Sequence, residues 1–169
     1  MQKLILPFTE EDYIKSKRYF TRIERLSGFC AEMALCNAFN KEWEHGYGEA
    51  DIELYNAPIQ VKSRLRNNNI KKLFYSLHQA KGYNRVRGFI FGEVVYDKND
   101  KAGYFEIYPY IYAKDYVLKN SEDLIRGGRN FGSHIHEDKL ATCPIKFRHE
   151  IKEEHLVGLL SRLKQKTNK

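Results

Sequence analysis

The sequence predicts a mixed α+β (α/β) fold in which a central mixed β-sheet of four to five strands is flanked by helices. A nearly unbroken apolar run of helical length covers 29–39. Two short segments of alternating polar and apolar residues follow at 50–54 and 59–63. Strand-forming residues return at 86–96 and 104–112. Helices and strands that interleave in this way are typical of a sheet covered by helices.

The composition is that of a folded protein with a basic surface. The 169 residues are 42% hydrophobic and 14% aromatic, which suits a globular domain with a real core. We expect one domain over residues 1–169, with its core at about 25–112 and a C-terminal elaboration at 113–169. The formal net charge of +7 favours a polyanionic partner. No apolar run is long enough to span a bilayer or to form a signal peptide, so we expect a cytoplasmic location and no membrane partner.

The first helical stretch is predicted at residues 9–27. It opens with Thr9-Glu10-Glu11-Asp12, and acidic residues in a first turn favour a helix N-terminus. Gly28 is expected to break this stretch, and a second helix follows to about Asn40. Glu32 lies on the apolar stripe of that second helix. A buried carboxylate is costly unless it meets a cation or a metal, which makes Glu32 a candidate functional residue.

An alternative for Glu32 is equally open at this point. The side chain would then lie at the edge of the apolar stripe and form an ordinary surface ion pair with Arg22, Arg25 or Lys41.

The alternating segments at 50–54 and 59–63 are predicted to form an antiparallel hairpin around a turn at Tyr55-Asn56-Ala57-Pro58. In this register Leu54 faces Ile59, Glu53 faces Gln60, Ile52 faces Val61 and Asp51 faces Lys62. Because strand side chains alternate between faces, one face collects the polar residues of this set and the other collects the apolar ones. The apolar face is expected to pack on a helix and the polar face to form a site. The polar residues are Asp51, Glu53, Gln60 and Lys62.

Beyond the hairpin, an amphipathic helix is predicted from Ile70 through Leu77, with Gly82 closing it. A Gly-rich basic turn at 126–132 suits contact with a phosphate backbone or an ordinary surface loop. A last amphipathic helix is predicted at 151–163.

The combination of Glu32, Asp51, Gln60 and Lys62 resembles the active-site pattern of the PD-(D/E)XK nuclease superfamily. In that family a helix supplies a Glu, one hairpin strand an Asp, and the next strand an acidic or Gln residue two positions before a Lys. The Gln60-Val61-Lys62 segment is similar to the QxK variant found in some homing and restriction endonucleases. The resemblance covers about residues 25–95 and implies a restriction-endonuclease-like core.

The resemblance implies a role for each of these residues and for a metal ion. A Mg²⁺ (or Mn²⁺) cofactor would be held by Asp51, Gln60, the Val61 carbonyl and Glu32, and Lys62 would act on the attacking water or the developing charge. Replacement of the usual Glu by Gln removes one negative charge. Additional charge is expected from the auxiliary residues Glu49 or Glu53. A second auxiliary pair, Gln79 and Tyr83, has a spacing similar to a motif of the RecB-like branch.

The implied activity is that of a metal-dependent endonuclease that hydrolyses phosphodiester bonds in double-stranded DNA. We expect a sequence- or structure-specific enzyme of homing, restriction or phage type that assembles as a dimer or tetramer. The alternatives are a nucleic-acid-binding module that does not cleave and an RNase. The basic residues predicted to contact nucleic acid are Arg64, Arg66, Lys71, Lys72, Arg85, Arg87, Arg126 and Arg129.

Overall fold

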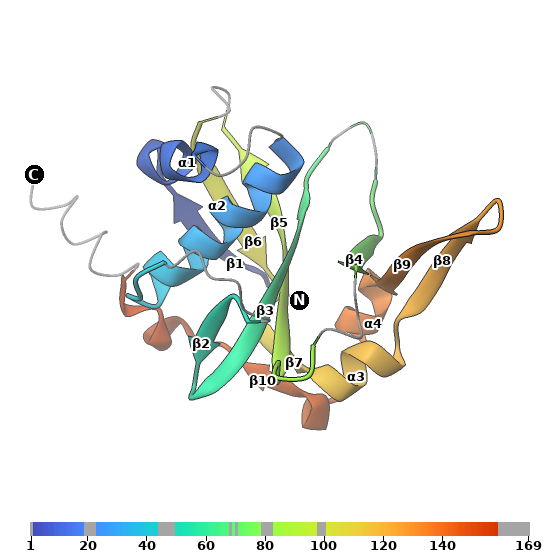
Figure 1. Cartoon of the computed structure of the whole chain (residues 1–169). Helices are drawn as coiled ribbons and strands as arrows, with labels where there is room; N and C mark the ends of the chain where they lie inside the picture. The colour runs from blue at the N-terminus through green and yellow to red at the C-terminus, as the bar shows by residue number, and fades with distance from the viewer. Residues whose placement is uncertain are drawn as a thin grey trace, which may run out of the picture.

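The computed structural model describes residues 2–18, 23–43, 50–67, 69, 71–78, 83–97 and 101–158. Over these residues the chain forms a mixed α+β structure with a large sheet, a small sheet and four α-helices (Figure 1). The fold class predicted from the sequence is confirmed at this level. No described helix has both the length and the apolar character needed to cross a membrane.

The large sheet has seven strands, more than the four to five predicted. Its main path runs β1-β6-β5-β3-β2, and β7 pairs with both β5 and β10. Strands β3 and β5 are parallel to each other, whereas the other pairs are antiparallel, so the sheet is mixed as predicted. The strands are β1 (Leu4–Phe8), β2 (Ile52–Leu54), β3 (Ala57–Leu65), β5 (Gly88–Tyr96), β6 (Gly103–Ile107), β7 (Tyr110–Ala113) and β10 (Arg148–Glu150).

The small sheet has three antiparallel strands in the order β4-β9-β8. Its strands are β4 (Phe74–His78), β8 (Glu122–Arg126) and β9 (Arg129–His136). The α-helices are α1 (Glu10–Lys17), α2 (Ile23–Ala38), α3 (Lys114–Lys119) and α4 (Glu137–Ala141), with single 3₁₀ turns at Ile145–Phe147 and Glu153–His155. Figure 1 shows α1 and α2 on one side of the large sheet and the small sheet on the other.

Strand β5 separates two hydrophobic clusters. Ile90 and Val94 contribute to a cluster that packs beneath α2, whereas Phe89 and Phe91 contribute to a cluster shared with the small sheet. All four side chains are buried, as expected for a strand covered on both faces. One face of β5 therefore joins the large sheet to α2, and the other face joins it to the small sheet.

The prediction of a helix from Ile70 to Leu77 is wrong, because residues 74–78 form strand β4. Tyr75 and Leu77 are fully buried while Phe74 is half exposed, which is the period of a strand. Tyr75 pairs with Ile135 of β9, a residue 60 positions later in the chain. This long-range pairing overrides the local helical pattern.

Three other element boundaries also differ from the prediction. Gly28 lies inside α2 and does not break it. The strand predicted at 104–112 is divided into β6 and β7. In the helix predicted at 151–163, residues 153–155 form a 3₁₀ turn, 157–158 are helical, and 159–163 lie outside the described part; strand β10 at 148–150 precedes it.

Candidate active site at the β2–β3 hairpin

Strands β2 and β3 form the predicted hairpin, but in a different register. Tyr55 and Asn56 both have positive φ values, +52° and +61°, which gives a two-residue turn of the type that matches strand twist. Ile52 therefore pairs with Ile59 and Leu54 with Ala57, so the predicted register was wrong by two residues. A shift of two leaves every side chain on its predicted face.

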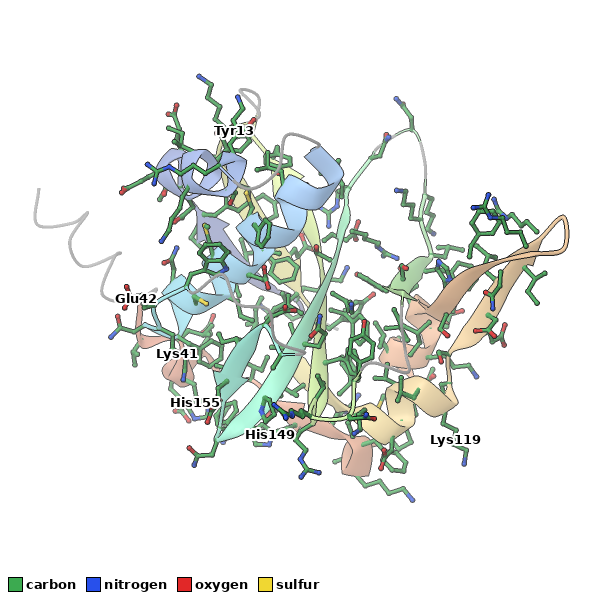
Figure 2. All side chains as sticks on the ribbon, in the orientation of Figure 1. Tyr13, Lys41, Glu42, Lys119, His149 and His155 are labelled. Atoms are coloured by element: carbon green, nitrogen blue, oxygen red, sulfur yellow. The ribbon has the colours of Figure 1, made fainter. Side chains whose placement is uncertain are left out.

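The hairpin turn is braced by the C-terminal part of the chain. The Tyr55 hydroxyl lies 2.5 Å from Nδ1 of His155, and the ring of His149 packs 4.8 Å from the Tyr55 ring, centroid to centroid. Figure 2 shows His149 and His155 beside the hairpin. The sequence contains no local signal for this contact, because the partners are about 100 residues apart.

Asp51 lies at the point where β2 begins. Its backbone N–H donates to the Ile59 carbonyl at 3.0 Å, and its Oδ2 accepts a 2.8 Å hydrogen bond from the Val61 N–H. The carboxylate thus occupies the place of the backbone acceptor that a longer β2 would offer to β3. Because the N–H and C=O of a strand residue point to the same edge, the Val61 carbonyl faces this edge too.

Glu32 on α2 lies beside Asp51, so the pKa values of the two carboxyl groups depend on each other. Burial raises the pKa of Glu32, the charge of Asp51 raises it further, and the indole of Trp43 and the charge of Lys62 oppose the rise. Burial also raises the pKa of Asp51, against hydrogen bonds from Glu32 and Val61 and the charge of Lys62. Neither carboxyl group titrates as a free surface acid would.

Lys62 completes this arrangement from β3. Burial lowers the pKa of its ammonium, while the charges of Asp51 and Glu32 raise it. The ammonium lies 5.0 Å from the centroid of the Tyr83 ring, and the Tyr83 hydroxyl donates to the Leu77 carbonyl at 2.6 Å. Tyr83, an auxiliary residue in the sequence prediction, is thereby fixed as an aromatic contact for the Lys62 cation.

Gln60 lies on the same face of β3 as Lys62, two residues before it. Its Oε1 is buried and accepts no hydrogen bond from any part of the chain that the structure describes. A buried carbonyl oxygen without a donor is destabilising unless a cation or another donor reaches it. Gln60 is therefore the second feature, after the carboxyl pair, that calls for a ligand.

The residues predicted to supply extra charge do not all join the cluster. Glu53 is exposed and lies opposite Pro58, not opposite Gln60 as predicted. Glu49 and Gln79 lie outside the described residues. Trp43, which the sequence analysis missed, contacts Glu32 but carries no motif that would have identified it.

The oxygen atoms of this cluster fit a hard divalent cation. Mg²⁺ is usually held by one or two carboxylates together with waters and other oxygens. Glu32 and Asp51 offer two carboxylates, and Gln60 Oε1 is an oxygen in need of a partner. Within the described ranges no three His, Cys, Asp or Glu residues come together as a metal-binding group, so the two acids would act with Gln60 and the Val61 carbonyl.

Two of the predicted nucleic-acid contacts form ion pairs with acids of this chain. Arg64 is only 9% exposed, and its Nη2 lies 2.7 Å from Glu137 and 3.5 Å from Glu93. Arg66 lies 3.1 Å from Glu106 and 3.5 Å from Glu93. These acids neutralise both guanidinium groups, so the expectation that Arg64 and Arg66 present free charge to a phosphate backbone is corrected.

The other predicted contacts are exposed. Lys71, Lys72 and Arg126 line a cavity of about 680 Å³ between β3 and the small sheet, and Ser63, the residue after Lys62, also lines it. Lys71 and Lys72 also line a neighbouring cavity of about 460 Å³. Neither cavity includes Glu32, Asp51 or Lys62, but the larger one starts one residue beyond Lys62. Arg85, Arg87 and Arg129 are exposed elsewhere on the surface.

No model of a known protein family matches the chain, and no curated protein matches it either.

Proposed function

We propose that the protein is a Mg²⁺-dependent endonuclease that hydrolyses phosphodiester bonds in double-stranded DNA. The observation that carries the proposal is the cluster of Glu32, Asp51 and Lys62 beside the buried Gln60 Oε1, which has no donor among the described residues. Two coupled carboxyl groups and a desolvated ammonium are costly to keep in a fold and are typical of catalytic sites. The resemblance of Glu32, Asp51, Gln60 and Lys62 to the QxK nucleases supports the same assignment.

Each residue of the site has a part in this reaction. Asp51 and Glu32 would hold the metal, with Gln60 Oε1 and the Val61 carbonyl as neutral oxygen ligands. The metal supplies a water of lowered pKa and charge stabilisation on the phosphate. Lys62, whose pKa burial lowers, is placed to orient that water or to stabilise the developing negative charge. The Tyr83 ring keeps the ammonium in position.

A second candidate function follows from Gln60. The site has only two described carboxylates, and an amide in the third place binds a divalent cation more weakly than a third carboxylate would. A protein that binds nucleic acid through the same surface without cleaving it would show the same buried cluster.

A plasmid-nicking assay with Mg²⁺ separates the two functions. Asp51→Asn should reduce nicking by about 10³-fold and Lys62→Met by about 10²-fold, because each removes a group that acts in the transition state. The matched controls are the exposed residues of α3, Asp115→Asn and Lys119→Met, which should nick as wild type. Figure 2 shows Lys119 at the outer side of α3.

The proposal fails if nicking survives both substitutions, or if wild-type protein bound to duplex DNA never nicks it in Mg²⁺ or Mn²⁺. Matched RNA and DNA duplexes in the same assay decide between a DNase and an RNase.

A further inference from the structure

Strands β8 and β9 form a projecting two-stranded ribbon, here called the arm and defined as residues 122–133. Asp123 pairs with Ser133, Ile125 with Asn130 and Arg126 with Arg129. From residue 125 to residue 131 every side chain is exposed. Figure 1 shows the arm extending away from the large sheet beyond β4. The arm thus leaves the body of the protein as a paired hairpin with one register shift, between Asp123 and Ile125.

The two glycines at the tip of the arm do not pack against any other described part of the chain. Gly127 and Gly128 have φ values of +56° and +74°, and a Cβ added to either would meet no atom within 4 Å. These glycines therefore serve the turn and do not make room for a neighbouring part of the chain. Side-chain bonds fix the rest of the arm: Ser133 Oγ donates to Asp123 at 2.9 Å, and the Gly132 N–H donates to Asn130 at 2.8 Å.

Apolar side chains are exposed on both faces of the arm. Ile125 is 63% exposed and Phe131 is 49% exposed. Ile125 lies opposite Asn130, so Phe131, the next residue, faces the other way. A flat partner surface would cover one of these faces, whereas a groove that encloses the ribbon would cover both.

The charge at the tip is positive. Arg126 pairs with Arg129, and the Arg129 guanidinium lies 5.7 Å from the centroid of the Phe131 ring. The acids of the arm, Glu122 and Asp123, lie at its base. The tip therefore combines two cations with apolar side chains and has no carboxylate beside them.

The arm borders the same cavity that begins beside the catalytic lysine. Arg126 and Asp123 of the arm line the 680 Å³ cavity together with Ser63 and Lys71. A polymer that occupies this cavity would reach from the arm to the residue that follows Lys62.

We propose that the arm enters the major groove of B-form DNA, with Ile125 and Phe131 against base edges and Arg126 and Arg129 on flanking phosphates. A major groove is about 12 Å wide and admits a two-stranded ribbon, and apolar side chains there contact thymine methyl groups. The deep, narrow major groove of A-form RNA does not admit such a ribbon. This inference rests on the proposed function only for its substrate class, and it selects DNA over RNA.

Binding without cleavage tests the inference directly. A fluorescent DNA duplex is titrated with full-length protein in EDTA, and anisotropy gives the dissociation constant at several salt concentrations. Ile125→Ala and Phe131→Ala should each weaken duplex binding by about tenfold with an unchanged salt slope. Arg126→Gln should lower the salt slope by about one. Ile145→Ala, at an apolar residue that is 79% exposed away from the arm, is the matched control and should bind as wild type.

Three results overturn the inference. One is wild-type DNA affinity in both apolar variants. Another is an equal loss on an RNA duplex of the same sequence. The third is loss of self-association in sedimentation with DNA affinity unchanged, which would make the arm a contact between copies of this chain. Because the substituted side chains are exposed, thermal unfolding should match wild type in every variant.

The arm and the catalytic proposal fail separately. Wild-type protein that binds DNA through the arm but does not nick it supports the arm and refutes the endonuclease. If wild-type protein nicks DNA and the arm variants bind DNA normally, the endonuclease proposal is supported and the arm proposal is refuted.

Discussion

One face of strand β3 carries two charged clusters that differ in how their charges are satisfied. The carboxylate cluster consists of Glu32, Asp51, Gln60 and Lys62, and the arginine network consists of Arg64 and Arg66 with Glu93, Glu106, Glu137 and Lys3. Lys62 and Arg64 are only two residues apart. In the arginine network each guanidinium meets two acids, although Arg64 Nε and Nη1 have no hydrogen-bond partner among the described residues. The carboxylate cluster instead places two acids beside each other and leaves the Gln60 amide oxygen with no donor among the described residues.

The difference teaches that charge alone does not identify a functional residue. Arg64 stacks at 4.2 Å on the Tyr75 ring and joins β3 to Glu137 of α4, so it ties the large sheet to the small one. The charge of Arg64 is therefore neutralised by acids that the fold places beside it. In the carboxylate cluster two acids lie together with only Lys62 as a nearby cation among the described residues, which is a free-energy cost that a bound cation can offset.

The sharpest test of this contrast is Arg64→Leu. Loss of a largely buried cation leaves Glu93 and Glu137 without it, and we expect the free energy of unfolding to fall by about 3 kcal/mol. Urea unfolding measures the change. Arg87→Leu, at an exposed arginine, is the matched control, and we expect it to change the free energy of unfolding by less than about 0.5 kcal/mol. If Arg64→Leu instead kept its stability and lost DNA affinity, Arg64 would belong with the phosphate contacts.

For Glu32→Gln we expect a smaller change in the free energy of unfolding, and the change should be stabilising. Because the folded-state pKa of Glu32 is raised above its unfolded value, the folded protein binds more protons and loses stability as pH rises above about 4.5. The amide does not titrate, so at pH 8 in EDTA the variant should be more stable by about 2 kcal/mol, and at pH 4 the gain should vanish. Urea unfolding at the two pH values measures this.

The same variant also tests metal binding. Mn²⁺ should raise the unfolding temperature of wild type and leave Glu32→Gln nearly unchanged. Equal stabilisation of both proteins by Mn²⁺ would place the metal elsewhere.

The smallest change in the free energy of unfolding is expected for Arg66→Gln. Its side chain is 31% exposed, so solvent screens its pairs with Glu93 and Glu106. We expect a loss below about 1 kcal/mol that shrinks further at high salt. Lys101→Gln, which breaks a pair with Glu10 between two largely exposed side chains, should change nothing measurable. A loss at Arg66 as large as at Arg64 would erase the distinction between buried and exposed members of the network.

The parts of the site that the sequence predicts are those governed by local periodicity. The alternation around Ile52 and Ile59 fixed which residues share a face, even though the turn at Tyr55 and Asn56 shifted the register. The apolar stripe of α2 likewise identified Glu32 as an acid in an apolar setting. Both depend on residues close in sequence.

The parts that failed depend on partners far along the chain. Phe74 and Leu77 suit a helix by spacing, and only pairing with β9 makes their segment a strand. Arg64 and Arg66 read as free cations because Glu93, Glu106 and Glu137 are 27 or more residues away. No local pattern in β3 encodes these ion pairs.

The contact between Tyr55 and His155 has a consequence for the order in which the protein is completed. A chain leaving the ribosome presents α2, both hairpin strands and β5 well before His149 and His155 exist. About 100 residues must be added after Tyr55 before His155 is available, so the hairpin turn emerges without its brace. The β2–β3 hairpin therefore acquires its brace only after the chain has been made through His155.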